Sequence, residues 1–561
     1  MTRNKQKIWI AALIGAMVLS GCTSAKQPKD TKQETTAHSE TETSASVVAE
    51  TQSAASETSS DPSSEKTEGI RIIPATLENE YLYDEVKYDD GTFKIGINSN
   101  YFVLKLGSLR NGTTDSSFLS ETEKKVMESV NKNMKEHADA IMKDYKDMAQ
   151  ENESIHKDDP DSDYGNHYYD DCNAKIRRCD SRILSLAITE ESFSGGPHGY
   201  VDYYGINYDM QNGRELAIED LVKDKEAFLS VVEKELLKDY PDIKDGLLGD
   251  NLSDMLREMY DHVDQQNMRF AFSMEGLELM FPQYDLTAYA AGPEFVFLKY
   301  KEHPELFHSE YFEVPKYYVE TLDEGLSYTI DDSNAAEHSL SYDFIRGDDP
   351  ELIDGIKVTL DGESFDVKDE YGFYDAKIYL FHSKYGNFLM IECKTDNDIH
   401  YKQMVDLQKR KILEQKEESG DDYAAPYDMI PLDPDHFSLS IRSDLASTTL
   451  IAKNFHLNEK GLPEAENAYY SYVSPIKFTL KEAEKFIVFQ NISEDGSKAK
   501  DTREFSEGTV FTLLRTDDKS WFDAQTEDGS YVHIPVDASD WPHLVNGKDV
   551  ESVFDGVIFA G

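Results

Sequence analysis

Few residue patterns in this chain are of the kind that carries out covalent chemistry. Ser474-Pro-Ile-Lys477 and Ser497-Lys-Ala-Lys500 have the Ser-x-x-Lys spacing in which a lysine can activate a serine, but neither Ser-Asp-Asn nor Lys-Thr-Gly accompanies them. The metalloprotease pattern His-Glu-x-x-His is absent, and Pro304 lies between His303 and His308. We therefore predict no catalytic residues, no bound metal and no cofactor.

An acidic stretch in the first third of the chain has part of the pattern of a calcium-binding loop. Asp159, Asp161 and Asp163 alternate, and Asp170 falls at the twelfth place counted from Asp159. Tyr164, however, occupies the sixth place, where the sharp turn of such loops requires glycine. We interpret the stretch as a solvated acidic loop.

Cysteine chemistry is open to two interpretations. Cys172 and Cys179 are close in the sequence, on a predicted bend between strands, and an oxidising compartment would allow a local disulfide between them. The alternative is that both are buried, unpaired thiols, as is predicted for Cys393 in a later strand.

The amino end of the chain has the pattern of an export signal. Arg3, Lys5 and Lys7 precede the apolar stretch 8–19, which is short for a membrane span but normal for a signal peptide. The following Leu19-Ser20-Gly21-Cys22 resembles the lipobox of bacterial lipoproteins. The resemblance implies removal of residues 1–21, lipidation of Cys22 and an extracytoplasmic location, anchored to the cell membrane by lipid.

Length and charge limit the remaining possibilities. The chain has 561 residues, enough for three or four domains, and a net charge of −52, which disfavours nucleic acid and favours cationic partners. Residues 22–69 contain no aromatic residue and are rich in Ser, Thr and Glu. They are predicted to form a lipidated, disordered stalk.

Residues 70–320 are predicted to form an α+β domain. Alternating apolar residues near 92–104 indicate early strands, and Ser120 with Glu123 forms a capping box. Apolar residues at helical spacing then predict one long amphipathic helix over about 126–148. Further helices are expected over 218–239 and 252–265.

Several motifs of this region resemble a family of bacterial envelope domains. They are Ser194-Gly195-Gly196-Pro197-His198-Gly199, Asn212-Gly213-Arg214-Glu215-Leu216 and Gly276-Leu277-Glu-Leu-Met-Phe281-Pro-Gln-Tyr284 with Tyr289-Ala-Ala-Gly292-Pro293. The region is similar to the extracellular domain of the lysozyme-sensing anti-sigma factor, which also occurs as the non-catalytic module of a peptidoglycan deacetylase. The resemblance implies a surface domain that engages lysozyme or peptidoglycan-related material.

The chain departs from that family in two respects. Only seven residues precede its apolar stretch, so control of a sigma factor is not transferable, and no His-x-x-x-His metal site accompanies the domain. His198 could contact a ligand or only hold its loop. The candidate binding residues are Gly195, Gly196, His198, Tyr200, Tyr204, Tyr284, Trp521 and Tyr531.

The second half of the chain is predicted to be rich in β-structure. Alternating segments in 325–480 favour an antiparallel β domain, with a sandwich or meander as its form. Residues 481–561 resemble bacterial SH3-like domains through Gly508-Thr-Val, Trp521-Phe522 and Ser530-Tyr531-Val532. That resemblance implies a small barrel, which either binds cell-wall peptide or is purely structural.

The predicted architecture is thus α+β: a mixed α/β ectodomain, an antiparallel β region and an SH3-like barrel. The function we expect is non-catalytic binding of peptidoglycan-related material or of a cationic protein such as lysozyme. The alternatives are a cell-wall polymer hydrolase that uses paired carboxylates, and a solute-binding lipoprotein.

Overall fold

The computed structural model describes residues 69–87, 94–151, 167–195, 198–262, 267–331, 336–347, 352–394, 400–413, 429–493 and 495–559. Cys22 and the acidic stretch 159–163 therefore lie outside the described residues. Residues Ile70–Gly561 form one compact unit. Among the described helices, none combines the length and the apolar character that a membrane span needs.

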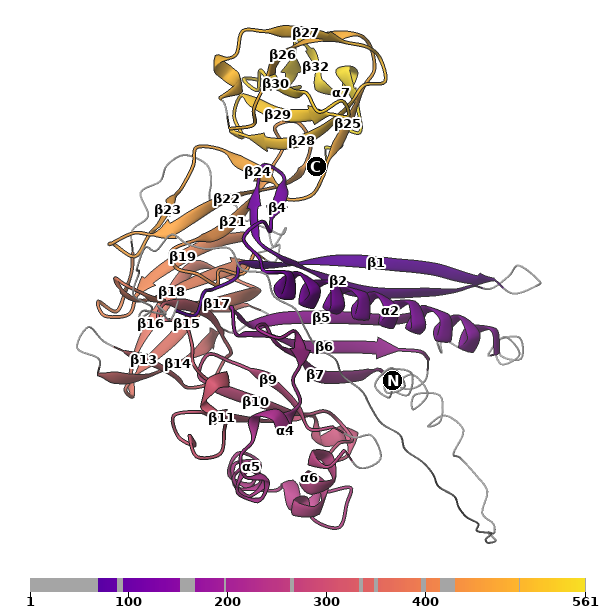
Figure 1. The fold of residues 1–561 in the computed structure, drawn as a ribbon. Coiled ribbons are helices and arrows are strands. Elements are labelled where there is room, and N and C mark those ends of the chain that lie inside the picture. Colours follow the sequence, from indigo (N-terminus) through magenta and orange to yellow (C-terminus); the bar gives the residue numbers. More distant parts are fainter. Residues whose placement is uncertain are drawn as a thin grey trace, which may run out of the picture. The chain divides into compact units, whose positions relative to one another are not determined.

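The first sheet is built from the amino-terminal third of the unit. Its strand order is β1 (Ala75–Lys87), β2 (Lys94–Leu106), β5 (His167–Cys179), β6 (Ile183–Phe193), β7 (Tyr200–Asp209) and β8 (Arg214–Glu215). Neighbours are antiparallel except for β2 and β5, which are parallel because helix α2 (Glu121–Glu151) connects them. Figure 1 shows α2 lying along β1, β2 and β5.

The predicted long helix is confirmed, and its start is set by the capping box. Ser120 Oγ accepts a hydrogen bond from the Glu123 backbone N–H, and Glu123 Oε2 accepts one from the Ser120 N–H. Its buried face contains residues at helical spacing, namely Val126, Val130, Met134, Ala138, Ile141, Tyr145 and Ala149. Packing of this stripe on β2 and β5 forms the core of the first layer.

A second core lies between short helices and a further sheet. The elements are α4 (Ile218–Leu221), α5 (Lys225–Asp239), α6 (Leu252–Tyr260), β9 (Arg269–Phe272), β10 (Gly276–Phe281) and β11 (Glu294–Lys299). The helix predicted over 218–239 is interrupted, because Asp224 adopts an extended conformation and caps α5 by accepting a hydrogen bond from Ala227 N–H.

A short hairpin joins the first sheet to the far end of the unit. It consists of β3 (Ser108–Arg110) and β4 (Thr113–Asp115). Asn454 Nδ2 donates to Leu109 O at 3.2 Å, and Asn111 N–H donates to Ser471 Oγ at 2.9 Å. The hairpin therefore has its hydrogen-bond partners more than 300 residues later in the chain.

The central region is antiparallel, as predicted. One sheet has the strand order β12 (Tyr318–Leu322), β17 (Asp375–Ser383), β18 (Gly386–Lys394), β19 (His400–Asp406) and β20 (Lys411–Ile412). The other sheet has the strand order β13 (Tyr328–Asp331), β14 (Glu337–Arg346), β15 (Ile353–Leu360) and β16 (Glu363–Phe373). Both sheets contribute side chains to one core, which is the arrangement of a β-sandwich.

The carboxy-terminal region is a continuous sheet with branches. Its elements are β21 (Phe437–Ser443), β22 (Thr449–Leu457), β23 (Pro463–Ala465), β24 (Tyr470–Tyr472), β25 (Lys477–Leu480), β26 (Glu484–Phe489), β27 (Thr502–Phe505), β28 (Val510–Thr516), β29 (Trp521–Thr526), β30 (Tyr531–Pro535) and β33 (Phe554–Asp555). The short elements β31 (Leu544–Val545), β32 (Lys548–Asp549) and α7 (Val550–Val553) pack beside it. The sheet crosses the predicted boundary at residue 480, because β24 pairs with β28. The chain as described is therefore richer in strands than the predicted α+β class implies.

Candidate functional site

The structure brings two of the predicted binding residues, His198 and Tyr284, together through a third aromatic residue. The rings of His198 and Tyr289 are stacked, with centroids 4.1 Å apart and planes inclined by 23°, and the ring of Tyr284 lies 5.9 Å from that of Tyr289. His198 is exposed, and Tyr284 is 38% exposed. We call His198, Tyr284 and Tyr289 the aromatic patch.

Three separate turns position the aromatic patch. His198 precedes β7, Tyr289 begins a short 3-10 helix that ends at Ala291, and Tyr284 follows β10 with a φ of 72°. Tyr284 N–H donates to Thr287 O at 3.1 Å, which closes the turn between the two tyrosines. Residues far apart in the sequence thus form one row of rings, in which His198 and Tyr284 are exposed and Tyr289 is half-buried.

A buried network of charges lies next to the patch. Arg269 forms an ion pair with Asp202, and its Nε lies 3.9 Å from Asp285 Oδ2. Burial raises the pKa of Tyr200, and the negative charge of Asp202 adds to this effect. Tyr200 is therefore a neutral member of this network rather than a member of the aromatic patch.

Asp285 gives this network a pH dependence that can be measured. Burial raises the pKa of Asp285 from 3.8 to about 6, although Arg269 opposes the rise. When the pKa of a carboxyl is higher in the folded state than in the unfolded state, the unfolded chain gives up its proton first as pH rises. The free energy of unfolding of the protein therefore falls between about pH 4 and pH 6. We expect Asp285→Asn to gain up to about 3 kcal/mol over the parent chain across this interval. Urea unfolding at a series of pH values measures this.

The control for that experiment is Asp250→Asn, which changes an exposed aspartate of the same region. It should follow the parent chain at every pH. Parallel stability curves for Asp285→Asn and the parent would contradict the prediction.

The other predicted binding residues lie elsewhere. Gly195 has a φ of 93°, so it occupies a left-handed turn that suits glycine, whereas Gly196 lies outside the described residues. Trp521 and Tyr531 are at opposite ends of the β29–β30 hairpin, where they face Pro535 and Gln525. Strand alternation places both on the same face of the hairpin, four residues apart in register.

Of the two interpretations of Cys172 and Cys179, the structure favours unpaired, buried thiols over a local disulfide. Both residues lie on strand β5, and seven residues of extended chain separate their Cα atoms by roughly 23 Å. A disulfide requires Cα atoms within about 7 Å. Among the described residues, Cys172, Cys179 and Cys393 are buried and form no disulfide, and burial raises the pKa of the first two thiols.

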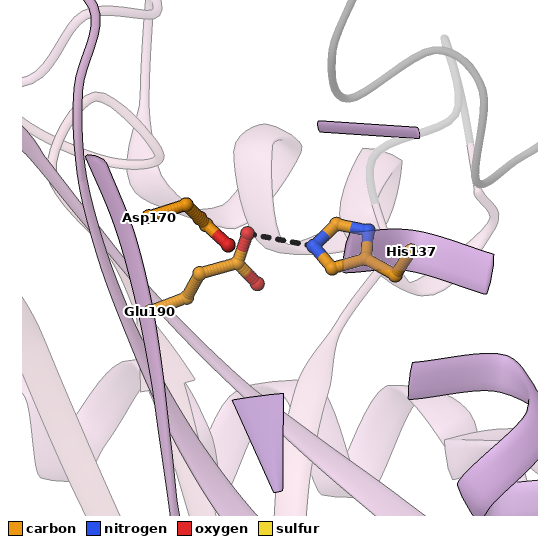
Figure 2. Close-up of side chains that lie close together, drawn as sticks. All are labelled: His137, Asp170 and Glu190. Atoms are coloured by element: carbon orange, nitrogen blue, oxygen red, sulfur yellow. Dashed lines mark hydrogen bonds and ion pairs between the residues drawn. The ribbon is translucent and has the colours of Figure 1, made fainter. Parts of the chain in front are cut away.

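A buried polar cluster that the sequence analysis did not predict lies between α2 and the first sheet. His137 comes from α2, Asp170 from β5 and Glu190 from β6, and their ligand-type atoms all lie within 4.8 Å of one another. His137 Nε2 is 2.8 Å from Glu190 Oε1. Figure 2 shows the three side chains pointing toward one another. We call them the His–Asp–Glu cluster.

Two hydroxyl groups orient the carboxylates of the cluster. Ser99 Oγ donates to Asp170 Oδ2 at 3.1 Å, and Tyr204 Oη donates to Glu190 Oε2 at 2.9 Å. Tyr204, which was predicted to bind a ligand, therefore turns its hydroxyl inward to this cluster. Asp170 Oδ1 has no hydrogen-bond partner among the described residues.

The two carboxyl groups differ in their affinity for a proton. Burial raises the pKa of Asp170 to about 8, and the negative charge of Glu190 contributes to the rise. Burial acts in the same direction on Glu190, but its hydrogen bonds to His137 and Tyr204 lower its pKa below the usual value. Without a cation, a proton on Asp170 and an ionised Glu190 facing His137 are therefore favoured.

Sequence reasoning missed this cluster because its members share no motif. His137, Asp170 and Glu190 become neighbours only when α2 packs on the sheet and β5 pairs with β6. One feature of the sequence could have indicated the cluster: Asp170 shares the inward-facing side of strand β5 with Tyr168 and Cys172. A carboxylate at an inward-facing position needs a partner.

Comparisons with known proteins give a family match for part of the chain. Residues 117–201 match the family described as deacetylase PdaC, and this segment contains all members of the His–Asp–Glu cluster and His198. Among curated proteins, none matches the chain. The family match favours a protein of the cell envelope and leaves its specific activity open.

Solved structures give a weaker likeness. A DUF3298 family member from Bacteroides fragilis has 16% identity and a TM-score of 0.32, and the match covers 43% of this chain and 96% of that one. A DUF3298 family protein from Pseudomonas aeruginosa has 14% identity and a TM-score of 0.26, and the match covers 42% of this chain and 97% of that one.

Proposed function

We propose that this chain is a non-catalytic binding protein of the cell surface, anchored by lipid on Cys22, that binds glycan-containing envelope material through the aromatic patch. The observation that carries the proposal is the row of rings formed by the exposed His198 and Tyr284 and the half-buried Tyr289. The lipobox-like sequence supports the location, and the family match supports a role at the envelope.

Exposed aromatic rings suit a sugar ligand for a physical reason. A pyranose ring presents C–H groups on its faces, which pack on flat aromatic side chains, while its hydroxyls bond to nearby polar groups. The ring edges of Tyr284 and Tyr289 carry hydroxyl groups for such bonds, and His198 adds a ring nitrogen. The tight turn that holds Tyr284 and Tyr289 reduces the entropy lost on binding.

The carboxylate pair of the His–Asp–Glu cluster is not placed for hydrolysis of a polysaccharide. Glycosidases place an acid and a base on either side of an accessible bond. The closely spaced pair Asp170 and Glu190 is 1% and 7% exposed, so a polysaccharide cannot reach it.

Replacing Tyr289 tests the proposal most directly. We expect Tyr289→Ala to weaken sedimentation of the full chain with insoluble peptidoglycan by about tenfold or more, because it removes the central ring of the patch. Tyr385→Ala, which removes a tyrosine that is 44% exposed in the β17–β18 turn, is the matched control. Equal binding by both variants and the parent would refute the role of the patch, and release of soluble glycan fragments would refute the non-catalytic assignment.

A cationic protein such as lysozyme is the second candidate ligand, and the net charge of −52 favours it. Attraction between oppositely charged proteins weakens as salt screens it. A complex with lysozyme that is lost between about 50 and 300 mM salt and is unaffected by Tyr289→Ala would identify charge, rather than the patch, as the basis of recognition.

A further inference from the structure

The donor set of the His–Asp–Glu cluster matches that of a metal site. It offers one imidazole and two carboxylates, and the ligand-type atoms lie within 4.8 Å of one another. Nitrogen and oxygen ligands bind Zn²⁺ at about 2.0–2.2 Å, which places them some 3–3.5 Å from each other. Small side-chain rotations would therefore bring the three groups onto one ion.

The surroundings of the cluster are those of an oriented coordination site. Ser99 and Tyr204 each bind one oxygen of a carboxylate, which leaves the second oxygen of that carboxylate facing the centre. Hydrogen bonds of this kind fix the orientation of metal-binding side chains. Asp170, which is 1% exposed, keeps Oδ1 without a hydrogen-bond partner in the described part of the chain. A buried carboxylate oxygen in this position needs a binding partner, which is either a proton shared with Glu190 or a cation.

The charge balance of the cluster also favours a cation. The hydrogen bonds that the structure gives to the two carboxylates come from Ser99, Tyr204 and His137 rather than from lysine or arginine. A divalent ion could take the place of the shared proton and balance both carboxylates in this buried position. Imidazole nitrogen together with carboxylate favours a transition metal such as zinc over Ca²⁺ or Mg²⁺.

We propose that His137, Asp170 and Glu190 form a binding site for Zn²⁺ that joins helix α2 to the β5–β6 hairpin. The site is distinct from the aromatic patch, so it does not depend on the proposed function. Its effect is to crosslink the helix to the sheet, and we assign it no catalytic step.

Metal content measured on matched variants tests the proposal. The full chain, purified without a histidine tag, is incubated with Zn²⁺, dialysed and analysed by mass spectrometry. We expect Asp170→Asn to retain about one equivalent less Zn²⁺ than the parent chain. We expect Tyr204→Phe, which removes only the orienting hydroxyl, to bind Zn²⁺ roughly 10–100-fold more weakly.

The control is Glu320→Gln. Glu320 Oε1 lies 2.9 Å from His382 Nε2 in another buried pair. This pair contains one carboxylate, whereas the His–Asp–Glu cluster contains two. This variant should keep the parent's Zn²⁺ content. If Asp170→Asn fails to fold, His137→Gln replaces it, because this helix residue is partly exposed.

Thermal unfolding gives an independent readout. Zn²⁺ should raise the melting temperature of the parent chain and of Glu320→Gln, chelation should reverse the rise, and the Asp170→Asn variant should not respond. Equal Zn²⁺ content in the parent and Asp170→Asn would overturn the proposal and leave a proton as the only ion shared by the carboxylates. Binding of Ca²⁺ in preference to Zn²⁺ would overturn the assignment of the metal.

Discussion

Replacing Arg178 with methionine is expected to lower the free energy of unfolding by about 3–5 kcal/mol, because it leaves a buried carboxylate without its cation. The side chains of Arg178 and Asp180 are both 0% exposed and form an ion pair at 2.7 Å. Arg178 also donates to the backbone oxygens of Tyr311 and Glu313 at 2.8 and 2.5 Å. These bonds fix the segment that follows the second core to the β5–β6 hairpin.

Urea unfolding followed by circular dichroism measures this loss. Arg182→Met is the matched control, since Arg182 lies on the same hairpin but is 28% exposed and pairs with the exposed Glu313. We expect it to change stability by less than about 1 kcal/mol. Replacing Arg178 and Asp180 together by apolar residues should recover only part of the loss, because no unpaired charge remains but the backbone groups that both side chains bind lose their partners. Equal effects of Arg178→Met and Arg182→Met would contradict the argument.

The Phe554→Ala substitution is expected to lower the free energy of unfolding by about 3–5 kcal/mol, because it opens a cavity in the carboxy-terminal core. Phe554 is 1% exposed. The rings packed around it are those of Phe478, Phe486, Phe511 and Phe522, with centroids between 5.4 and 6.3 Å away. These rings come from four different strands, so the Phe554 side chain packs against several branches of the sheet at once.

Thermal or urea unfolding of Phe554→Ala can be compared with that of Ile558→Ala. Ile558 is four residues further on and 68% exposed, so its truncation should cost less than about 0.5 kcal/mol. A Phe554→Ala chain as stable as the Ile558→Ala chain would show that the phenylalanine cluster repacks around the missing ring.

Local signals account for the parts of the fold that could be predicted. The capping box at Ser120 and the apolar stripe of α2 lie within one segment, so the sequence pattern alone specifies this helix. The alternation in residues 355–392 likewise predicted antiparallel strands. The boundaries near 320 and 480 could not be predicted, because β12 pairs with β17 and β24 with β28 across long intervals of sequence.

The candidate sites show the same division. His198, Tyr284 and Tyr289 could be named from their motifs, but only the folded chain shows that the Tyr289 ring stacks on His198 and lies 5.9 Å from that of Tyr284. The His–Asp–Glu cluster depends on the packing of a helix on two strands, and no spacing in the sequence encodes such a contact. The disulfide interpretation of Cys172 and Cys179 does not hold, because proximity in sequence is a poor guide to distance when both residues lie on one extended strand.

The β3–β4 hairpin has a consequence for how the protein is made. Residues 108–115 are synthesised long before Asn454 and Ser471. The backbone oxygen of Leu109 therefore lacks its donor, and the backbone N–H of Asn111 lacks its acceptor, during most of translation. Contacts of such high sequence separation slow folding and expose intermediates to aggregation and proteolysis. Nascent chains that end before residue 454 should therefore depend on chaperones, and completion of the last quarter of the polypeptide marks the point at which the amino-terminal layer becomes protected.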